Sequence, residues 1–425
     1  MSLKAASANQ TASEFPKPID AGQSFFQDPY PFLAEVREFA PAWPVRFPDG
    51  IADERWLICR HHDVVAALAD PRLSNDLGTT MDPPDGDRSK LPLARQVILR
   101  ANDLLGEAVA HLDPPEHSRV RRLASRPFRA DRIERFRPRI ADLAAQAVAR
   151  LPEGEFDLME AVARPLPISI VCEVLGVPVA DAEVFRDVAR VIGGFVEDGA
   201  SAETLRVLDD FDDYVRRLIA GKRNHPGDDV LSALTSVQHG GDQLSEDELV
   251  SLSALLILAG HETTVQLIAG GLLALFAHPD QFAQVRADLS LLPGVVEETL
   301  RYDGSVNPGV PRLATEDIPL GDQVIPAESY VVIGIAAANR DPRKWDRPDE
   351  FDINRKQAGR LLSFGHGIHY CLGAKLSRIV GEETLRALLT RFPEIELAAP
   401  RDQLRWRNGF IRVLEKLPLR SRANA

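Results

Sequence analysis

The chain has 425 residues, a formal net charge of −13 and a sequence pI near 5.3. A hydrophobic content of 44% with 27% charged residues is typical of a globular protein with a core large enough to bury a sizeable cofactor. The acidic balance argues against nucleic acid and anionic membranes as partners. The three cysteines lie far apart and form no CxxC pair, which argues against a disulfide framework, a zinc ribbon or an iron–sulfur cluster and favours the cytoplasm.

The N-terminal segment, MSLKAASANQTASEFPKP, is polar and lacks the apolar stretch of a signal peptide, so residues 1–20 are predicted to form a flexible tail. Residues 21–425 show no internal repeat and no linker, and we expect them to form a single domain. Helical and strand-like segments alternate from Asp28 to Leu73, which predicts a small sheet. Residues 74–110 have no steady period and are predicted to form a long loop with short helices, of the kind that often covers a site.

Helical patterns dominate the middle of the chain, from Ser118 to about Ala277, and are separated by short breaks such as LPEGEF. Strand signals return after Thr315, in DIPLGDQVIPAESYVVIGIAA, and again near the C-terminus. The sequence therefore predicts a mainly α fold with a minor β portion.

The most apolar segment, from Ser245 to His278, is predicted to be one helix of about 50 Å at a rise of about 1.5 Å per residue. Ser245 and Glu248 form a capping box, and Leu244 and Leu249 are placed for a hydrophobic staple. A helix apolar on nearly every face is either a membrane span or the central helix of a large fold. Polar residues at its centre and the absence of flanking lysines and arginines favour the central helix.

The centre of this helix carries the sequence AGHETT, residues 259–264. A buried glutamate such as Glu262 is costly unless it is hydrogen-bonded or has a function. Gly260 removes side-chain bulk where a flat ligand could approach the backbone. The hydroxyl of Thr263 can either donate to the carbonyl of Ala259 or point at a ligand.

The sequence FGHGIHYCLG, residues 364–373, places one of the three cysteines ahead of a predicted helix. A helix N-terminus favours a thiolate and lowers the pKa of Cys371. Gly365 and Gly367 allow backbone conformations and close approach that a β-carbon would obstruct. Three interpretations stay open: a nucleophile with His369 as its base, a metal ligand, or a buried core cysteine.

The pattern F-x-x-G-x-H-x-C-x-G, formed by Phe364, Gly367, His369, Cys371 and Gly373, closely resembles the haem-binding signature of the cytochromes P-450. The resemblance implies the cytochrome P-450 fold, with haem b between the 245–278 helix and the helix that follows the cysteine. It implies that Cys371 is the iron ligand, whose electron donation favours O–O cleavage.

Further motifs match the same family in order, so that the resemblance covers roughly residues 25–415. AGHETT resembles the oxygen-activating stretch of the family's central helix, which implies that Glu262 and Thr263 relay protons. The family often has aspartate where this chain has Glu262.

ETLR resembles the structural E-x-x-R pair, formed here by Glu298 and Arg301 at i and i+3 on one helix face. The usual third partner is an arginine or histidine, but the matching place in RPDEFD holds Glu350. We expect Arg347 or Arg355 to substitute for it.

DPPEHSRVRR, residues 113–122, resembles the start of a helix that holds the haem propionates in the family. The resemblance implies propionate contacts by His117 and Arg121, one turn apart, and by Arg312 and His369. Four cationic or donor groups around two carboxylates suit a buried dianionic cofactor.

The chain shows no nucleotide-binding half, so electrons must come from another protein. Its length and its N-terminus resemble the soluble bacterial class that is served by a ferredoxin and its reductase. Between His117 and Ile140 there are nine arginines against two acids, and Lys375 and Arg378 follow the cysteine. This basic segment is predicted to dock an acidic ferredoxin, although single arginines could equally be solvated surface residues.

The resemblance implies a monooxygenase that activates O2 to hydroxylate or otherwise oxidise a bulky, mostly hydrophobic substrate in bacterial secondary metabolism. A peroxygenase or oxidative coupling enzyme and a non-catalytic haem sensor remain alternatives, and the intact pair of Glu262 and Thr263 favours the use of dioxygen. The substrate pocket that the resemblance implies is mainly apolar. Its lining would come from residues 74–110, Val191 to Val196, Leu256, Ala259, Val306 to Val310 and Asn408 to Ile411.

Overall fold

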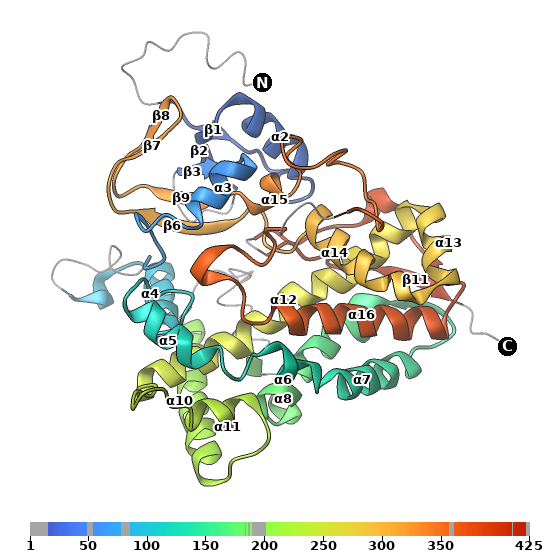
Figure 1. The fold of residues 1–425 in the computed structure, drawn as a ribbon, viewed down its shortest axis with the longest axis horizontal. Helices are drawn as coiled ribbons and strands as arrows, with labels where there is room; N and C mark the ends of the chain where they lie inside the picture. Colours follow the sequence, from blue (N-terminus) through green and yellow to red (C-terminus); the bar gives the residue numbers. More distant parts are fainter. Residues whose placement is uncertain are drawn as a thin grey trace.

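The computed structural model describes most of the chain. The described residues are 16–48, 54–77, 86–182, 184, 185, 188, 201–356, 361–409 and 411–421. Most of the predicted tail and the predicted pocket segment from Val191 to Val196 lie outside them. Figure 1 shows the large sheet at the upper left, whereas the long helices lie across the centre, the right and the lower part of the molecule.

A six-stranded sheet joins the two ends of the sequence. Its strand order is β1-β2-β3-β9-β6-β4. In chain order the strands are β1 (Ile19–Asp20), β2 (Ala42–Arg46), β3 (Arg55–Ile58), β4 (Leu73–Ser74), β6 (Val310–Ala314) and β9 (Tyr330–Ile333). The pairing of β3 with β9 is parallel, with Trp56 opposite Val331. The predicted N-terminal strands and β9, one of the strands predicted after Thr315, are therefore parts of one sheet.

The smaller elements complete the β portion and cover the large sheet. One three-stranded sheet has the order β10-β11-β5, and β7 pairs with β8. The segment LPEGEF, expected as a break between helices, contributes to β5. The bounds are β5 (Gly154–Asp157), β7 (Ile318–Leu320), β8 (Gln323–Ile325), β10 (Glu396–Leu397), β11 (Pro418–Ser421), α2 (Tyr30–Phe39), α3 (His61–Ala67) and α15 (Ile335–Ala338).

The remaining helices form the larger, helical part of the protein, as predicted. They are α4 (Leu93–Leu105), α5 (Glu116–Ala124), α6 (Ala130–Glu134), α7 (Arg137–Ala149), the π-helix η2 (Met159–Ala163), α8 (Pro165–Leu175), α10 (Ala202–Asn224), α11 (Val230–Thr235), α12 (Glu246–Ala277), α13 (Pro279–Ala287), α14 (Leu292–Tyr302) and α16 (Ala374–Arg391). Short 3₁₀ turns are η1 (Arg88–Lys90), η3 (Val179–Asp181), η4 (Leu289–Leu291), η5 (Gly367–His369) and η6 (Arg401–Gln403).

The predicted loop at residues 74–110 contains a regular helix, α4, of 13 residues. The sequence prediction underestimated it because Pro92 and Gly106 flank a short pattern, although Val97, Leu104 and Leu105 lie at helical spacing and are buried in the core. Residues 93–105 are therefore one continuous helix and not several short ones.

The central helix α12 begins and ends where the sequence predicts. The Ser245 hydroxyl accepts from the N–H of Glu248 at 3.1 Å, and the Glu248 carboxylate accepts from the N–H of Ser245 at 2.8 Å. Leu244 and Leu249 are buried in the same core. Among the helices of the described residues, only α12 is long and apolar enough to cross a membrane, and 67% of its most apolar window is buried inside the protein. It is therefore the central helix of the fold.

Small residues let α16 pack closely against α12. A β-carbon on Gly381 of α16 would come within 3.0 Å of Cδ2 of Leu267 on α12. A β-carbon on Gly271 would come within 3.4 Å of Cδ1 of Leu385. This close packing fixes the start of α16, and with it the cysteine loop, relative to the middle of α12 (Figure 1).

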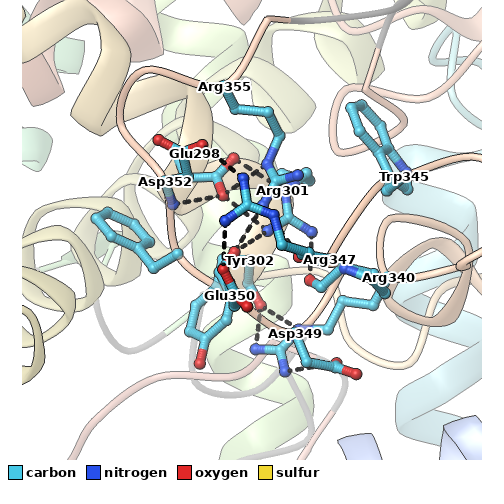
Figure 2. A network of polar contacts seen from close by, with 12 residues as sticks. Glu298, Arg301, Tyr302, Arg340, Trp345, Arg347, Asp349, Glu350, Asp352 and Arg355 are labelled. Atoms are coloured by element: carbon cyan, nitrogen blue, oxygen red, sulfur yellow. Dashed lines mark hydrogen bonds and ion pairs between the residues drawn. The ribbon is translucent and has the colours of Figure 1, made fainter.

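The E-x-x-R pair on α14 forms a buried network with the segment before the cysteine loop (Figure 2). Arg301 donates to both oxygens of Glu298, at 2.9 and 2.7 Å, and to the carbonyl of Glu350 at 2.9 Å. The third partner is Arg355, whose Nε lies 3.0 Å from Oε1 of Glu298. Arg347, the other predicted substitute, instead pairs at the surface with Glu350. Arg355 therefore replaces the residue that is missing at position 350.

We expect Arg355→Met to destabilise the protein by about 1–3 kcal/mol, because it removes a charged hydrogen bond from a buried carboxylate. Arg347→Met is the matched control and should change stability by less than about 0.5 kcal/mol, since the Arg347 side chain is 57% exposed. Thermal unfolding of the two variants measures the difference. Equal losses in both variants would contradict the assignment of Arg355.

Candidate functional site

The loop that carries Cys371 is turned by two glycines. Gly365 has φ of 74° and Gly367 has φ of 69°, a left-handed conformation that side chains disfavour. The N–H of Cys371 donates to the carbonyl of Phe364 at 2.9 Å and closes the loop. Gly373 is the N-cap of α16, so the cysteine directly precedes the helix start, as predicted.

The predicted lowering of the Cys371 pKa is wrong. The side chain is accessible, but the protein encloses it on most sides, and this burial raises the pKa of the thiol above its usual value. The amides of Gly373 and Ala374 and the charges of Arg121 and Arg378 act in the opposite direction, but their effect is smaller. A thiolate at this position therefore needs a stronger positive partner than the protein supplies, which a bound metal cation would provide.

In the middle of α12 one small residue is exposed, although residues on both sides of it in the sequence are buried. Ala259 is exposed, whereas its neighbours Leu258 and His261 are buried. The predicted role of Gly260 is wrong, because a β-carbon there would lie 2.9 Å from Cγ2 of Val171 on α8. Gly260 serves helix packing, and the exposed residue at this place is Ala259.

The two threonines that follow bond back to their own helix. The Thr263 hydroxyl donates to the carbonyl of Ala259 at 3.2 Å, and the Thr264 hydroxyl donates to that of Gly260 at 3.2 Å. Of the two options for Thr263, the structure adopts the bond to the backbone. A hydroxyl that donates in this way can still accept a hydrogen bond from another group.

The Glu262 carboxylate is largely buried and has two partners. Oε1 lies 3.3 Å from Nε2 of His261, and Oε2 lies 3.2 Å from Nη2 of Arg407. Burial acts to raise the pKa of Glu262, but the His261 hydrogen bond and the charges of Arg407 and Arg164 outweigh it. The carboxyl pKa is therefore below its usual value, and the group is ionised at neutral pH.

The predicted propionate contacts lie close together. The rings of His117 and His369 are 4.1 Å apart between centroids, and burial together with the neighbouring charges lowers the pKa of both histidines. Burial lowers the pKa of Arg312 to about 10. Arg121, one turn from His117 on α5, donates to the carbonyl of Tyr370 in the cysteine loop. The structure thus gathers donors from α5, β6 and the cysteine loop.

One of these donors lacks a hydrogen-bond partner among the described residues, and another has only a backbone carbonyl as its partner. His117 is 1% exposed, and neither of its ring nitrogens has a hydrogen-bond partner among the described residues. Arg312 is 8% exposed and donates to the carbonyl of Pro311 at 2.7 Å. Buried donors in this state are unfavourable unless an anionic group accepts from them. The site therefore fits the two carboxylates of haem.

His369 is held by residues that sequence reasoning missed. Its Nε2 lies 2.9 Å from Nδ2 of Asn75, and the same amide donates to Asp113 at 3.1 Å. Asp113 also accepts from Ser74. Burial, followed by the charges of His117 and Arg312, lowers the pKa of His369 to about 3, which argues against its role as a base for Cys371. No local pattern identifies Asn75, because its partners are distant in sequence.

A cavity of about 730 Å³ opens between α4, α10 and the start of α12. Its lining includes Ser74, Leu99, Leu104, Val250 and Ser251, and it contains none of the residues at 256, 259, 306–310 and 408–411 that are expected to line the substrate pocket. This cavity is rich in carboxylates, and the predicted substrate pocket stays a prediction. Its acidic lining residues are Asp76, Asp103, Glu107, Asp113, Glu116, Asp212 and Asp247.

A cysteine ahead of a helix that packs on the central helix, beside two buried or half-buried arginines and a buried histidine without a hydrogen-bond partner, fits the site of a haem-thiolate protein. The family model Cytochrome P450 matches residues 201–412. The chain is 41% identical over 406 residues to cytochrome P450 monooxygenase PikC of Streptomyces venezuelae, covering 94% of this chain and 93% of that protein.

Two further comparisons agree with this one. The chain is 38% identical over 401 residues to 6-deoxyerythronolide B hydroxylase of Saccharopolyspora erythraea, covering 93% of this chain and 97% of that protein. The structure of the tirandamycin C-bound P450 monooxygenase TamI superposes with a TM-score of 0.83 and 38% identity, covering 95% of this chain and 100% of that one.

The chain therefore belongs to the cytochrome P450 family and has its fold. Its cofactor is haem b, and it is a monooxygenase, an oxidoreductase that binds O2 and incorporates oxygen from it. When bound, the haem supplies the iron at which O2 is activated. The protein's residues hold the cofactor, shape the substrate pocket and move protons.

Proposed function

We propose that Cys371 is the thiolate ligand of the haem iron, and that His117, Arg121, Arg312 and His369 hold the propionates. The observation that carries the proposal is the buried His117, whose ring nitrogens have no partner among the described residues although it lies beside the cysteine loop. The Asn75 side-chain amide lies 2.9 Å from Nε2 of His369 and orients the histidine ring for this role. The raised pKa of Cys371 is consistent with a sulfur that becomes anionic only when it binds a metal.

The substrate is a bulky, mostly hydrophobic organic molecule of bacterial secondary metabolism. Support comes from the similarity to a 6-deoxyerythronolide B hydroxylase and to a monooxygenase solved with tirandamycin C. Two of the apolar residues expected to line the pocket, Leu256 and Val310, are partly exposed. Val306 forms a β-bridge with Ile411, which brings two of the expected lining segments together. We assign the chain to the cytoplasm, because electron donors of the kind that serve its bacterial relatives would reach it there.

Cys371→Ala and Cys371→His should abolish the thiolate red shift of the Soret band in the reduced, carbon-monoxide-bound protein, because no other thiolate would reach the iron. Cys172→Ala is the matched control, since this cysteine is also reduced but is buried in the core. Absorption spectroscopy of the three variants decides the assignment. A red shift that survives the loss of Cys371 would exclude it as the ligand.

We assign the proton relay to Glu262 and Thr263. Glu262 is ionised and faces His261 and Arg407, and the Thr263 hydroxyl stands one turn above the accessible Ala259. A carboxylate beside a hydroxyl provides the donor and acceptor that a relay requires.

Thr263→Val should uncouple NAD(P)H consumption from product and release peroxide, because it removes the hydroxyl while it keeps the side-chain shape. Glu262→Gln should slow coupled turnover by about 10²-fold. Thr264→Val is the matched control, since its hydroxyl also bonds the backbone one residue further on. Product and peroxide yields per NAD(P)H measure the effect. Unchanged coupling in Thr263→Val would remove this residue from the relay.

Electrons come from a ferredoxin and its reductase, and the basic segment at residues 117–140 is the docking surface. Most of its nine arginines have partners within the protein; for example, Arg119 pairs with Asp242 and Arg139 pairs with Glu173. Arg132 and Arg135 have no ion-pair partner among the described residues. Their charge therefore remains available to an acidic partner.

Arg135→Glu should reduce the rate of electron transfer from ferredoxin several-fold at low ionic strength, with a smaller effect at high salt. Arg217→Glu on α10 is the matched control, since it makes the same change of net charge at another exposed arginine. Stopped-flow reduction by ferredoxin and by dithionite separates docking from chemistry. Equal slowing in the two variants would argue against this docking surface.

A further inference from the structure

We propose that Arg407 is a positioning residue for oxygen activation, which holds the Glu262 carboxylate ionised and sets the pH range in which it can deliver protons. The inference rests on the relay role proposed above for Glu262. Arg407 belongs to none of the sequence motifs described above, and it lies 145 positions from Glu262 in the chain.

Each carboxylate oxygen of Glu262 has one partner. His261 engages Oε1 at 3.3 Å, and Arg407 engages Oε2 at 3.2 Å. Each oxygen keeps a further acceptor site through which the carboxylate can exchange a proton. Of the two, Arg407 carries a permanent charge, so it is the partner that favours the ionised form at every working pH.

Backbone hydrogen bonds hold the segment around Arg407, so the position from which its side chain extends is defined. The N–H of Arg407 donates to the carbonyl of Val413 at 2.9 Å, and the N–H of Glu415 donates to that of Arg405 at 2.8 Å. Trp406 and Leu414 form a bridge between the same two stretches. The guanidinium therefore extends from a hairpin-like turn onto the centre of α12.

The same turn belongs to the predicted substrate pocket. Ile411 pairs with Val306, and the N–H of Arg412 donates to the carbonyl of Ser305 at 2.8 Å. Arg407 thus stands between the segment expected to contact substrate and the carboxylate expected to move protons.

The charged groups that face Glu262 come from three elements. They are His261 on α12, Arg407 on the C-terminal turn and Arg164 at the start of α8. Arg164 is bound elsewhere, to Glu160 and to the carbonyl of Glu415. Burial acts to raise the pKa of Glu262, and the His261 hydrogen bond and the charge of Arg407 act to lower it. Loss of Arg407 removes the permanent cation in direct contact with the carboxylate and leaves only the His261 hydrogen bond in contact to oppose burial, so the Glu262 pKa should rise.

Infrared difference spectra of the haem-loaded, substrate-free protein over a pH series test the proposal, with Glu262→Gln to assign the carboxyl band. In Arg407→Gln the pH of half-protonation should rise by about 1 unit or more, because an opposite charge at this distance is lost. Arg407→Lys should show a smaller rise, since it keeps the charge. Arg405→Gln, on the same turn but bonded to the carbonyls of Asp402 and Leu404, should show none.

The pH profile of product formed per NAD(P)H is the second measurement, and it should move upward together with the infrared midpoint. An unchanged midpoint in both Arg407 variants would overturn the assignment of Arg407, whatever Glu262 does in catalysis. A shifted midpoint with an unchanged profile, together with normal coupling in Glu262→Gln, would instead overturn the relay role on which the inference rests.

Discussion

The cost of taking charge out of water governs this structure. Burial raises the pKa of the Cys371 thiol and lowers the pKa of Arg312, so the bare protein disfavours the charged form of both groups. At the proposed site, haem would reverse both effects at once, since its iron would be a cation for the sulfur and its propionates would be anions for the arginine. Cofactor binding at this site would therefore also stabilise the fold.

Elsewhere the protein stabilises buried charged groups with its own side chains. Glu298 is buried with Arg301 and Arg355, and this network ties α14 to the segment that leads into the cysteine loop. Glu262 is buried with Arg407, which ties α12 to the C-terminal turn. In both cases an arginine distant in sequence fixes the position of a carboxylate on a helix, and its planar, permanently charged group suits that task.

Sequence reasoning succeeded where the deciding information is local. The capping box at Ser245 located the start of α12, and the glycines of the cysteine loop indicated its left-handed turns. It failed where tertiary contacts decide. The direction that Gly260 faces depends on Val171 of α8, and the Cys371 pKa depends on enclosure by the whole protein. The partners Asn75 and Arg407 carry no local signal, because only the assembled fold brings them to the site.

The hydrogen bond between Asn75 and His369 joins residues that are 294 positions apart in the chain. The parallel pairing of β3 with β9 likewise joins strands that are separated in the sequence by most of the helices. Closing such long loops costs entropy, which slows the formation of these contacts. The residues proposed to hold the haem extend from His117 to Cys371, so most of the chain must be synthesised before the proposed site can assemble. A chain that ends before the cysteine loop would keep His117, Arg121 and Arg312 but would lack His369 and Cys371.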